Sequence, residues 1–460
     1  MILGSAGTGY SGTEHSRQGR AGLIPCDPMQ PLQPHPSFSE ALRFWLKLGF
    51  ISFGGPTGQI AIMHGELVER KRWVSEARFL HALNYCMLLP GPEAQQLAIY
   101  IGWLLHGTLG GLVAGILFVL PSAIILWGLS YVYVTWGTLP AIAAVFYGLK
   151  PAVVAIVAHA VLRIGKRTLK NEIMWALAAS AFVAIYFLQA PFPAIIAGAA
   201  LVGLVGARFA PSHFDVIKGH SSAGDGEAVQ LAPSAAPSWG RVVRVILLSG
   251  ALWWTPIACA GAMLGAGHPL TQLGLFFSKA AMVTFGGAYA VLPYVAQQAV
   301  ERYAWLAPGQ MLDGLGLAET TPGPLIMVVQ FVGFLGGWNH PDPWTPLVSA
   351  TLAAAMTTWV TFVPCFLWIF LGAPYVEGLR RSRVIGAALS CITAAVVGVV
   401  LNLAVWFALG VVLPAGMGFD YFAGAIVVAS IGLLAANRVG VIGVVALGTF
   451  AGVFRFAVGL

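Results

Sequence analysis

Two proline-glycine-proline segments carry the clearest chemical signal in the chain. They are residues 89–93 (LPGPE) and 321–325 (TPGPL), and each lies inside a long apolar stretch. Proline removes a backbone donor and glycine relaxes φ, so each segment should interrupt a helix. The helix that resumes after the break starts with unpaired N–H groups, which attract anions. We therefore expect two broken helices that present backbone amides to a negatively charged ligand.

Two glutamates flank these segments, because Glu93 follows the first and Glu319 precedes the second. A carboxylate beside a bound dianion repels it unless the carboxylate is protonated, and removal from water favours the protonated form. We therefore expect Glu93 and Glu319 to carry coupling protons. Lys150 is the expected counter-charge, either for an anion or for one of the two glutamates. A buried Glu–Lys pair that only holds helices together is the structural alternative.

Glycines and polar side chains near these segments complete the predicted binding surface. A polar side chain inside a membrane span is costly against lipid, so by default it lines the protein interior. A purely structural kink at the prolines and small-residue helix packing at the glycines are the alternatives that the residues leave open. The predicted substrate-binding residues are Phe53, Gly54, Gly55, Pro56, Gln59, Pro90, Gly91, Pro92, Gln95, Gln96, Lys150, Gly286, Gly287, Thr320, Thr321, Pro322, Gly323 and Pro324.

The composition indicates an integral membrane protein. Of the 460 residues, 58% are hydrophobic and only 9% are charged, whereas roughly a quarter are charged in soluble domains. Spans of about 20 apolar residues predict an all-α fold, a polytopic membrane helix bundle with about 13 transmembrane helices. The net charge of +7 is attributed to loop lysines and arginines that orient the chain, so no nucleic-acid partner is expected.

Cysteines and histidines give no sign of a metal or cofactor. The five cysteines and ten histidines are dispersed, without CxxC or Cys/His spacing. A membrane-embedded enzyme would need clustered His, Asp or Ser groups at an interface, and the sequence has no such cluster. We therefore expect no cofactor, no metal site and no catalytic residues.

The second half of the chain repeats landmarks of the first. The triplet Phe-Gly-Gly at 53–55 recurs at 285–287, 232 residues later. Trp73 recurs as Trp305, and the first Pro-Gly-Pro segment recurs as the second, at the same spacing. Three landmarks in one register indicate an internal duplication.

The duplication divides the chain into two halves joined by a polar linker. In the later part of each half the repeat spacing lengthens to 243 residues, as Pro121 and Pro364 show. The expected segments are a disordered cytoplasmic N-terminal tail (1–38), a first transmembrane repeat (39–207), a cytoplasmic linker (208–240), an extra transmembrane helix (241–266) and a second transmembrane repeat (267–460).

Equivalent spans lie seven apart, and this odd number predicts that the second repeat is inverted relative to the first. Residues 163–170 of half one carry four cations, whereas the counterpart loop of half two carries none. The preceding loop shows the reverse, with three arginines at 380–383 and no charge in half one. By the positive-inside rule the two halves therefore face opposite ways. The basic residues 70–72 do not fit this orientation.

These motifs resemble the chromate ion transporter (CHR) family in its long, two-domain bacterial form. The resemblance runs from about Ser39 to the C-terminus. It is carried by residues 53–103, which begin with FGGP and contain LPGPE, and by the weaker echoes at 285–295 and 319–334. Half two departs from the family pattern at Ala288 and Leu325, so half one is expected to make most substrate contacts.

The resemblance implies a secondary transporter of the inner (plasma) membrane that exports chromate and confers chromate resistance. A carrier for sulfate or another small oxyanion is the alternative, because the sequence does not separate tetrahedral dianions of similar size. A channel is disfavoured, since paired interruptions in inverted repeats suggest alternating access. The expected partners are the oxyanion and the lipid bilayer, with a homodimer expected only by analogy with other transporters.

Overall fold

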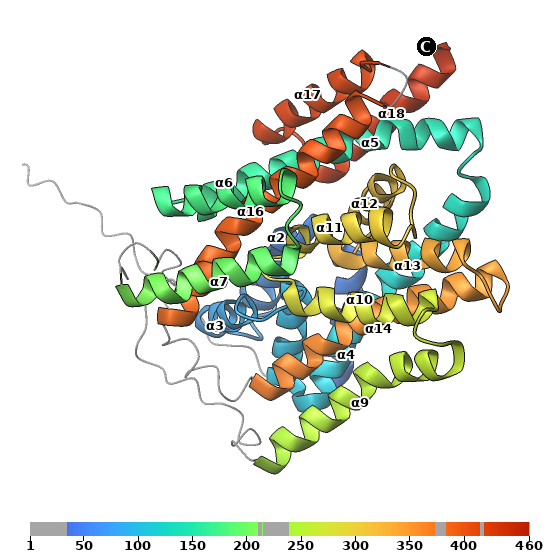
Figure 1. Ribbon diagram of the computed structural model, residues 1–460. Helices are drawn as coiled ribbons and strands as arrows, with labels where there is room; N and C mark the ends of the chain where they lie inside the picture. Colours follow the sequence, from blue (N-terminus) through green and yellow to red (C-terminus); the bar gives the residue numbers. More distant parts are fainter. Residues whose placement is uncertain (1–34, 210–213, 215–238, 373–382, 415–417, 460) are drawn as a thin grey trace, which may run out of the picture. The chain divides into compact units, whose positions relative to one another are not determined.

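The protein is entirely helical in the part that the structure describes. The computed structural model describes residues 35–209, 214, 239–372, 383–414 and 418–459, and these contain sixteen α-helices and no strand (Figure 1). Within these ranges the all-α prediction is confirmed. Most of the predicted tail (1–38) and linker (208–240) lies outside the described residues.

The first half contains seven α-helices. They are α1 (Phe38–Ile51), α2 (Gly55–His64), α3 (Glu76–Cys86), α4 (Glu93–Trp136), α5 (Pro140–Thr168), α6 (Glu172–Tyr186) and α7 (Phe192–Phe209). A π-helix, η1 (Gly65–Arg70), continues α2. The backbone of α4 is not helical at His106 and Gly107, so α4 consists of two helices joined at a kink.

The second half repeats this order after one extra helix, α9 (Trp239–Leu264). Its elements are α10 (Pro269–Val283), α11 (Ala288–Gln297), the π-helix η3 (Gln298–Arg302), α12 (Gln310–Thr320), the 3₁₀-helix η4 (Leu325–Met327), α13 (Val328–Asn339), α14 (Pro346–Gly372), α16 (Arg383–Val412), α17 (Tyr421–Ala435) and α18 (Val441–Val458). Here α13 and α14 take the place of the two parts of α4.

Both Pro-Gly-Pro segments and both Phe-Gly-Gly segments interrupt helices. In half one, α1 stops at Ile51 and α2 starts at Gly55, while α3 stops at Cys86 and α4 starts at Glu93. The equivalent gaps of half two separate α10 from α11 and α12 from η4. The glycines in these gaps adopt positive φ, which other residues seldom tolerate.

The repeated segments share irregular backbone geometry as well as sequence. η1 and η3 are equivalent at the 232-residue spacing, and after each of them a non-glycine residue has φ of 51°. A tryptophan then bonds back into each π-helix, Trp73 to Leu67 at 2.9 Å and Trp305 to Ala299 at 2.8 Å. Both tryptophans belong to the main hydrophobic core. Matched irregularities of this kind support an internal duplication, because neither follows from ordinary helix geometry.

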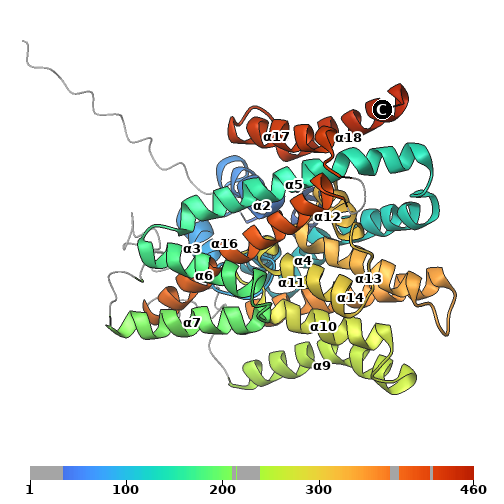
Figure 2. The ribbon, with the colours of Figure 1, turned by 45° about the horizontal axis from the view of Figure 1, so that its top comes forward.

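One long helix of each half packs against the last two helices of the other half (Figure 2). α5 contacts α17 and α18, and α16 contacts α6 and α7. Glycines allow this close approach, since a Cβ at Gly148 would collide with the backbone of Gly448, and one at Gly398 with the backbone of Ala178. These glycines therefore serve helix packing, as small residues commonly do in membranes.

In the part of the chain that the structure describes, seven helices are long and apolar enough to cross a membrane, which makes the chain a multi-pass membrane protein. They are α4, α5, α7, α9, α14, α16 and α18, and the shorter apolar helices are α6, α13 and α17. In the described ranges, continuous helices do not reach the predicted count of about 13 spans. The breaks divide the first expected span of each half, leaving α1 with 14 residues and α2 with 10.

Candidate functional site

Each Pro-Gly-Pro segment crosses the Phe-Gly-Gly segment of the opposite half. The N–H of Gly91 donates to the carbonyl of Thr284 at 2.8 Å, and the N–H of Gly323 donates to the carbonyl of Ser52 at 2.7 Å. Thr284 and Ser52 precede the two Phe-Gly-Gly triplets, and both bonds are related by the 232-residue spacing. Gln59 adds a side-chain bond from its Nε2 to the carbonyl of Gly323. The two breaks are thus held mainly by main-chain atoms of the other half.

Backbone angle and surroundings both require the central glycine of each Pro-Gly-Pro segment. φ is 117° at Gly91 and 118° at Gly323, a region that side chains rarely adopt. An added Cβ would lie 3.0 Å from Cys365 Sγ at Gly91 and 2.5 Å from Ser122 Cβ at Gly323. Ser122 and Cys365 are themselves equivalent at the 243-residue spacing, and each follows a proline. Each break therefore lies against the proline-containing helix of the other half.

The helices that start at these crossings have no side-chain caps. No side chain accepts a hydrogen bond from the first turn of α2, α4, α11 or η4. Among the described residues, five other helices do have such caps, provided by Ser37, Ser75, Asn171, His268 and Asp420, whereas α5, α12, α13 and α18 also lack one. α2 packs on α4, α11 packs on η4, and α4 packs on η4. Uncapped N–H groups at helix N-termini favour a bound anion.

Two arginines of α5 supply positive charge at these breaks. The charge of Arg167 acts on Glu93, and the charge of Arg163 acts on Glu319. Both arginine side chains are exposed, and they lie one helical turn apart near the C-terminal end of α5. Both glutamates are therefore within electrostatic reach of the same end of α5.

The two glutamates differ in their surroundings. Glu319 is buried, and its Oε1 accepts a short hydrogen bond from the hydroxyl of Tyr289. Glu93 is half-buried, and among the described residues it has no hydrogen-bond or ion-pair partner. Glu93 is thus the carboxyl group with more freedom to interact with a bound ion.

Lys150 does not lie with the glutamates. Its Nζ is 3.5 Å from Oδ2 of Asp313, and the same oxygen accepts a hydrogen bond of 2.9 Å from the hydroxyl of Tyr133. Lys150 and Arg163 are thirteen residues apart on α5, which is about 20 Å along a helix. Of the two predicted roles of Lys150, pairing with one of the two glutamates is therefore wrong, and binding of an anion stays a prediction. α12 meets α5 through the face that carries Asp313, since Gly309 and Gly316 on that face contact Lys150 and its neighbour.

The predicted glutamines contribute less to an anion site than expected. Nε2 of Gln96 donates to the carbonyl of Pro90 at 2.8 Å and so closes the first break. The Oε1 atoms of Gln95 and Gln96 are buried and have no partner within the described ranges. Amide oxygens are acceptors, so these two atoms suit a hydrogen-bond donor such as a water molecule rather than an anion.

The hydroxyls of the predicted threonines are engaged within their own helix, and the two segments that meet at one crossing differ in exposure. The hydroxyls of Thr320 and Thr321 both donate to the carbonyl of Leu317 inside α12, so their protons are already engaged. Residues 53–58, which contain Phe53, Gly54, Gly55 and Pro56, are all at least partly exposed, whereas residues 321–325, which meet them at the Gly323–Ser52 crossing, are buried. Access to this crossing is therefore from the side of half one.

Four polar residues of this region were not among the predicted site residues: Arg163, Arg167, Asp313 and Tyr289. The two arginines belong to a run of four cations, and such a run explains chain orientation as well as ligand binding. Only the packing of α5 beside the breaks distinguishes the two roles. Asp313 does have a sequence signal, because a charged residue within an apolar segment usually lines the interior.

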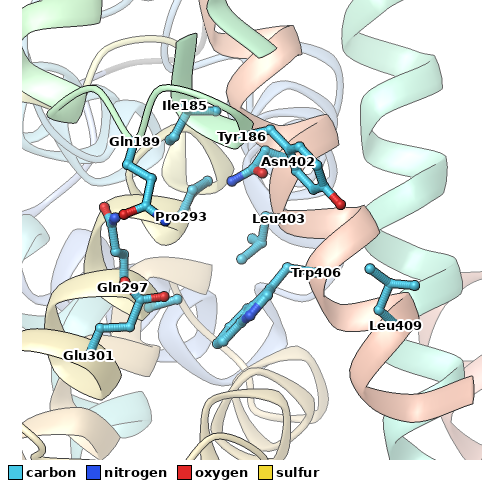
Figure 3. Close-up of a pocket in the computed structure, with 11 residues that line it drawn as sticks. Ile185, Tyr186, Gln189, Pro293, Gln297, Glu301, Asn402, Leu403, Trp406 and Leu409 are labelled. Atoms are coloured by element: carbon cyan, nitrogen blue, oxygen red, sulfur yellow. The ribbon is translucent and has the colours of Figure 1, made fainter. Parts of the chain in front are cut away.

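A separate cavity of about 200 Å³ lies between the C-terminal end of α6, α11, η3 and α16 (Figure 3). Its lining includes the amides of Gln189, Gln297 and Asn402 and the carboxylate of Glu301. None of the eleven lining residues is a lysine or arginine, and none belongs to a Pro-Gly-Pro segment. This cavity is therefore poorly suited to a dianion.

Comparison with known proteins places the chain in a family. The chromate transporter family model matches residues 39–204 and 271–453. The chromate transport protein of Pseudomonas aeruginosa is 32% identical over 376 residues, which cover 81% of each chain. That of Cupriavidus metallidurans is 31% identical over 369 residues, 80% of this chain and 82% of the relative. A probable chromate transport protein of Synechococcus elongatus is 30% identical over 373 residues, 80% of this chain and 84% of the relative.

The two matched segments run from α1 into α7 and from α10 into α18, and they leave out α9. No solved structure matches the chain. A family of transporters agrees with the multi-pass helical fold and leaves no role for enzymatic catalysis. The chain is a member of the chromate transporter family.

Proposed function

We propose that this transporter exports chromate from the cell across the inner membrane and so confers chromate resistance. The observation that carries the proposal is the pair of reciprocal crossings, where helices start without side-chain caps and where the charges of Arg167 and Arg163 act on Glu93 and Glu319. Backbone N–H groups and guanidinium groups bind oxyanions through charge-assisted hydrogen bonds. Chromate is the anion named for the relatives in Pseudomonas aeruginosa and Cupriavidus metallidurans.

We further propose that the two halves are inverted repeats that exchange access between the two membrane faces. Support comes from the symmetry of the contacts between the halves. Each residue of the Gly91–Thr284 bond has its equivalent, at the 232-residue spacing, in the Gly323–Ser52 bond. The contacts of α5 with α18 and of α16 with α7 are related by the same symmetry, because α16 is the equivalent of α5 and α18 is the equivalent of α7. If each broken pair, such as α1 with α2, completes one of about 13 spans, equivalent spans differ by seven and the repeats are inverted. The arginines at 380 and 381, which support this orientation, lie outside the described residues.

The family match supports the proposed division of the chain. Its two segments, 39–204 and 271–453, fall within the proposed repeats, 39–207 and 267–460. The linker (208–240) and the extra helix (241–266) fall between the matched segments.

Substrate contact is assigned mainly to half one. Its Phe-Gly-Gly-Pro residues 53–56 are all partly exposed, whereas Gly287 and Ala288 at the equivalent positions of half two are buried. In half two, Gly286, Gly287 and the buried residues 321–324 support the crossing from the other side. Glu93 and Glu319 are the proposed proton-coupling groups, because an ionised carboxylate would repel the dianion and a protonated one would not.

Export of a dianion agrees with the membrane potential. Moving two negative charges out of a cell that is negative inside is downhill by about 4.6 kcal/mol at 100 mV, twice the value for one charge. Efflux can therefore run on the potential, with protons that modulate it.

Uptake into inverted membrane vesicles tests the function. Vesicles with a lumen-positive potential should accumulate chromate when they contain this protein, because their lumen corresponds to the cell exterior. Absence of chromate accumulation would exclude a chromate exporter.

A sulfate or other small-oxyanion carrier is the second candidate, since the N–H groups and arginines of the site recognise charge and shape shared by these anions. The same vesicles, given labelled sulfate alone and chromate with excess sulfate, separate the two. Faster sulfate uptake together with complete competition would favour the second candidate. Assembly as a homodimer stays a prediction, which light scattering of the purified protein would test.

A further inference from the structure

Asp313 places a carboxylate where an anion would bind to Lys150. Nζ of Lys150 lies 3.5 Å from Oδ2 of Asp313, and the hydroxyl of Tyr133 donates to the same oxygen at 2.9 Å. The side chain of Asp313 is 5% exposed, whereas that of Lys150 is 32% exposed. Lys150 is thus a partly exposed cation that is paired on its buried side with the carboxylate of Asp313. This is the arrangement of an anion site in which a carboxylate already occupies the position of the anion.

The second carboxylate oxygen of Asp313 has no partner. Oδ1 is buried and forms no hydrogen bond with any described residue. A buried acceptor without a donor is unfavourable, and most unfavourable when it carries charge. A proton can therefore bind at Oδ1 without displacing an existing hydrogen bond.

Few other charged groups face Asp313. α12 packs against α4, α5, α13, α18 and η4. Of these, α4 contributes Tyr133 and α5 contributes Lys150, while α13 and η4 contain no charged or titratable residue. α18 contributes Arg455, which pairs with Asp420 at 3.3 Å. Lys150 and Tyr133 are thus the groups that act directly on the charge of Asp313.

Lys150 cannot hold the Asp313 carboxylate and an incoming dianion equally well. With Asp313 ionised, a dianion at Lys150 would bring three negative charges to one cation in a site of low dielectric constant. Protonation of Asp313 removes one of these charges and releases Lys150 for the anion. Anion binding at Lys150 and proton binding at Asp313 should therefore occur together.

We infer that Asp313 mimics the substrate, holding Lys150 while no anion is bound, and that one proton binds Asp313 as the oxyanion reaches Lys150. The inference rests on the proposed function and adds a second oxyanion position, about 20 Å along α5 from Arg163. In this exchange the Lys150–Asp313 ion pair breaks and a Lys150–oxyanion pair forms. The proton comes from the aqueous phase and returns to it when the anion leaves.

The Asp313→Asn variant tests the inference in inverted vesicles. Its half-saturation concentration for chromate at neutral pH should fall by about threefold or more, because Lys150 no longer has a competing charge. Acidification should then change that concentration less than in the wild type. Because chromate itself takes up a proton in weak acid, each variant is compared with the wild type at the same pH.

Two further variants separate competition from a structural role. Lys150→Gln should raise the half-saturation concentration by about tenfold, and Asp313→Asn should have no further effect in that background. Tyr133→Phe keeps the carboxylate but removes one of its hydrogen bonds, so the concentration should fall by only about twofold and the pH response should remain.

An Asp313→Asn protein with the wild-type half-saturation concentration and pH response would overturn the inference. If that variant does not fold, the other two decide, and unchanged concentrations in both Lys150→Gln and Tyr133→Phe would overturn it. Absence of chromate uptake by the wild type would overturn the proposed function and this inference together. Normal uptake with unaltered variants would overturn the inference alone.

Discussion

The two halves share their main-chain crossings but not the side chains at those crossings. Gly91 and Gly323 differ by one degree in φ and donate equivalent bonds to the opposite half. Glu93 of half one is nevertheless replaced by Leu325 in half two, at the same spacing. The crossing constrains the backbone, whereas the side chains around it are free to specialise.

The halves also differ in access at their Phe-Gly-Gly segments. Residues 53–56 are all partly exposed, whereas in the equivalent segment of half two Phe285 and Gly286 are partly exposed and Gly287 and Ala288 are buried. Residues 53–56 meet the buried Pro-Gly-Pro segment of half two at one crossing, through the bond from Gly323 to Ser52. The half-one side of that crossing is therefore the more exposed one.

A third difference concerns charge next to the matched tryptophans. Nζ of Lys71 lies 4.4 Å from the ring centroid of Trp73, whereas Tyr303 stacks on Trp305 with the ring centroids 4.3 Å apart. A cation in half one is therefore replaced by an aromatic ring in half two. The arginines of α5 add further positive charge to half one.

The largest effect is expected when the charge of half one is removed at Arg163 and Arg167. The double variant Arg163→Gln/Arg167→Gln should lower chromate uptake at low concentration by about 30-fold or more, since two charge-assisted interactions are lost. Uptake into inverted vesicles measures this. Lys166→Gln/Lys170→Gln is the matched control, because it removes the same charge from the same helix end and should cost less than about threefold. Equal losses in both variants would show that the arginines only orient the chain.

A smaller but still clear effect is expected on stability when the two central glycines are compared. Gly323→Ala should destabilise the protein by about 2–4 kcal/mol, because positive φ is strained and the Cβ would lie against Ser122. Gly91→Ala should cost about 1–2 kcal/mol, since its nearest atoms are a thiol and the end of a glutamine side chain. Thermal unfolding in detergent measures which of the two variants is the less stable. Adding Ser122→Gly should restore part of the loss in Gly323→Ala and none in Gly91→Ala.

The third comparison sets Glu93 against its counterpart Leu325. Glutamine resembles the protonated carboxyl, so Glu93→Gln at neutral pH should transport chromate as the wild type does in weak acid, a change of about threefold. The dependence of uptake on pH should be correspondingly flatter. Leu325→Gln is the control in half two and should leave the pH dependence unaltered. Wild-type behaviour of Glu93→Gln would remove this residue from proton coupling.

The smallest effect is expected at Pro56, because Ala288 serves the equivalent position of half two. Pro56→Ala should lower stability by about 0.4–1 kcal/mol through greater freedom of the unfolded chain. Initial rates of chromate uptake should stay within about twofold of the wild type, a range that corresponds to about 0.4 kcal/mol. A much larger loss of transport would mean that the proline ring itself contacts the substrate.

Much of the fold could be predicted because its main signals are local. Proline and glycine interrupt helices through their own backbone chemistry, so the breaks before Gly55 and Glu93 were visible in the sequence. The repeat spacing was equally visible. The number of membrane spans was less accessible, because a segment of apolar residues does not show whether two short helices cross the membrane together.

The partners of the site residues could not be predicted, because they depend on helix rotation and packing. Lys150 was expected to be the counter-charge either of an anion or of a glutamate, yet it pairs with Asp313, which lies six residues before Glu319 on the same helix. The close contact of Gly309 and Gly316 with α5 brings Asp313 to Lys150, whereas Glu319 lies within electrostatic reach of Arg163, farther along α5.

The reciprocal crossings have a consequence for how the protein is made. The carbonyl of Ser52 and the N–H of Gly91 are synthesised early, but their partners, Gly323 and Thr284, emerge only with the second half of the chain. Until then the first half has been inserted with two main-chain groups that neither lipid nor its own helices can satisfy. We expect biogenesis to pass through a stage in which the early helices remain loosely assembled beside the insertion machinery. We also expect membrane proteases to degrade truncated chains readily.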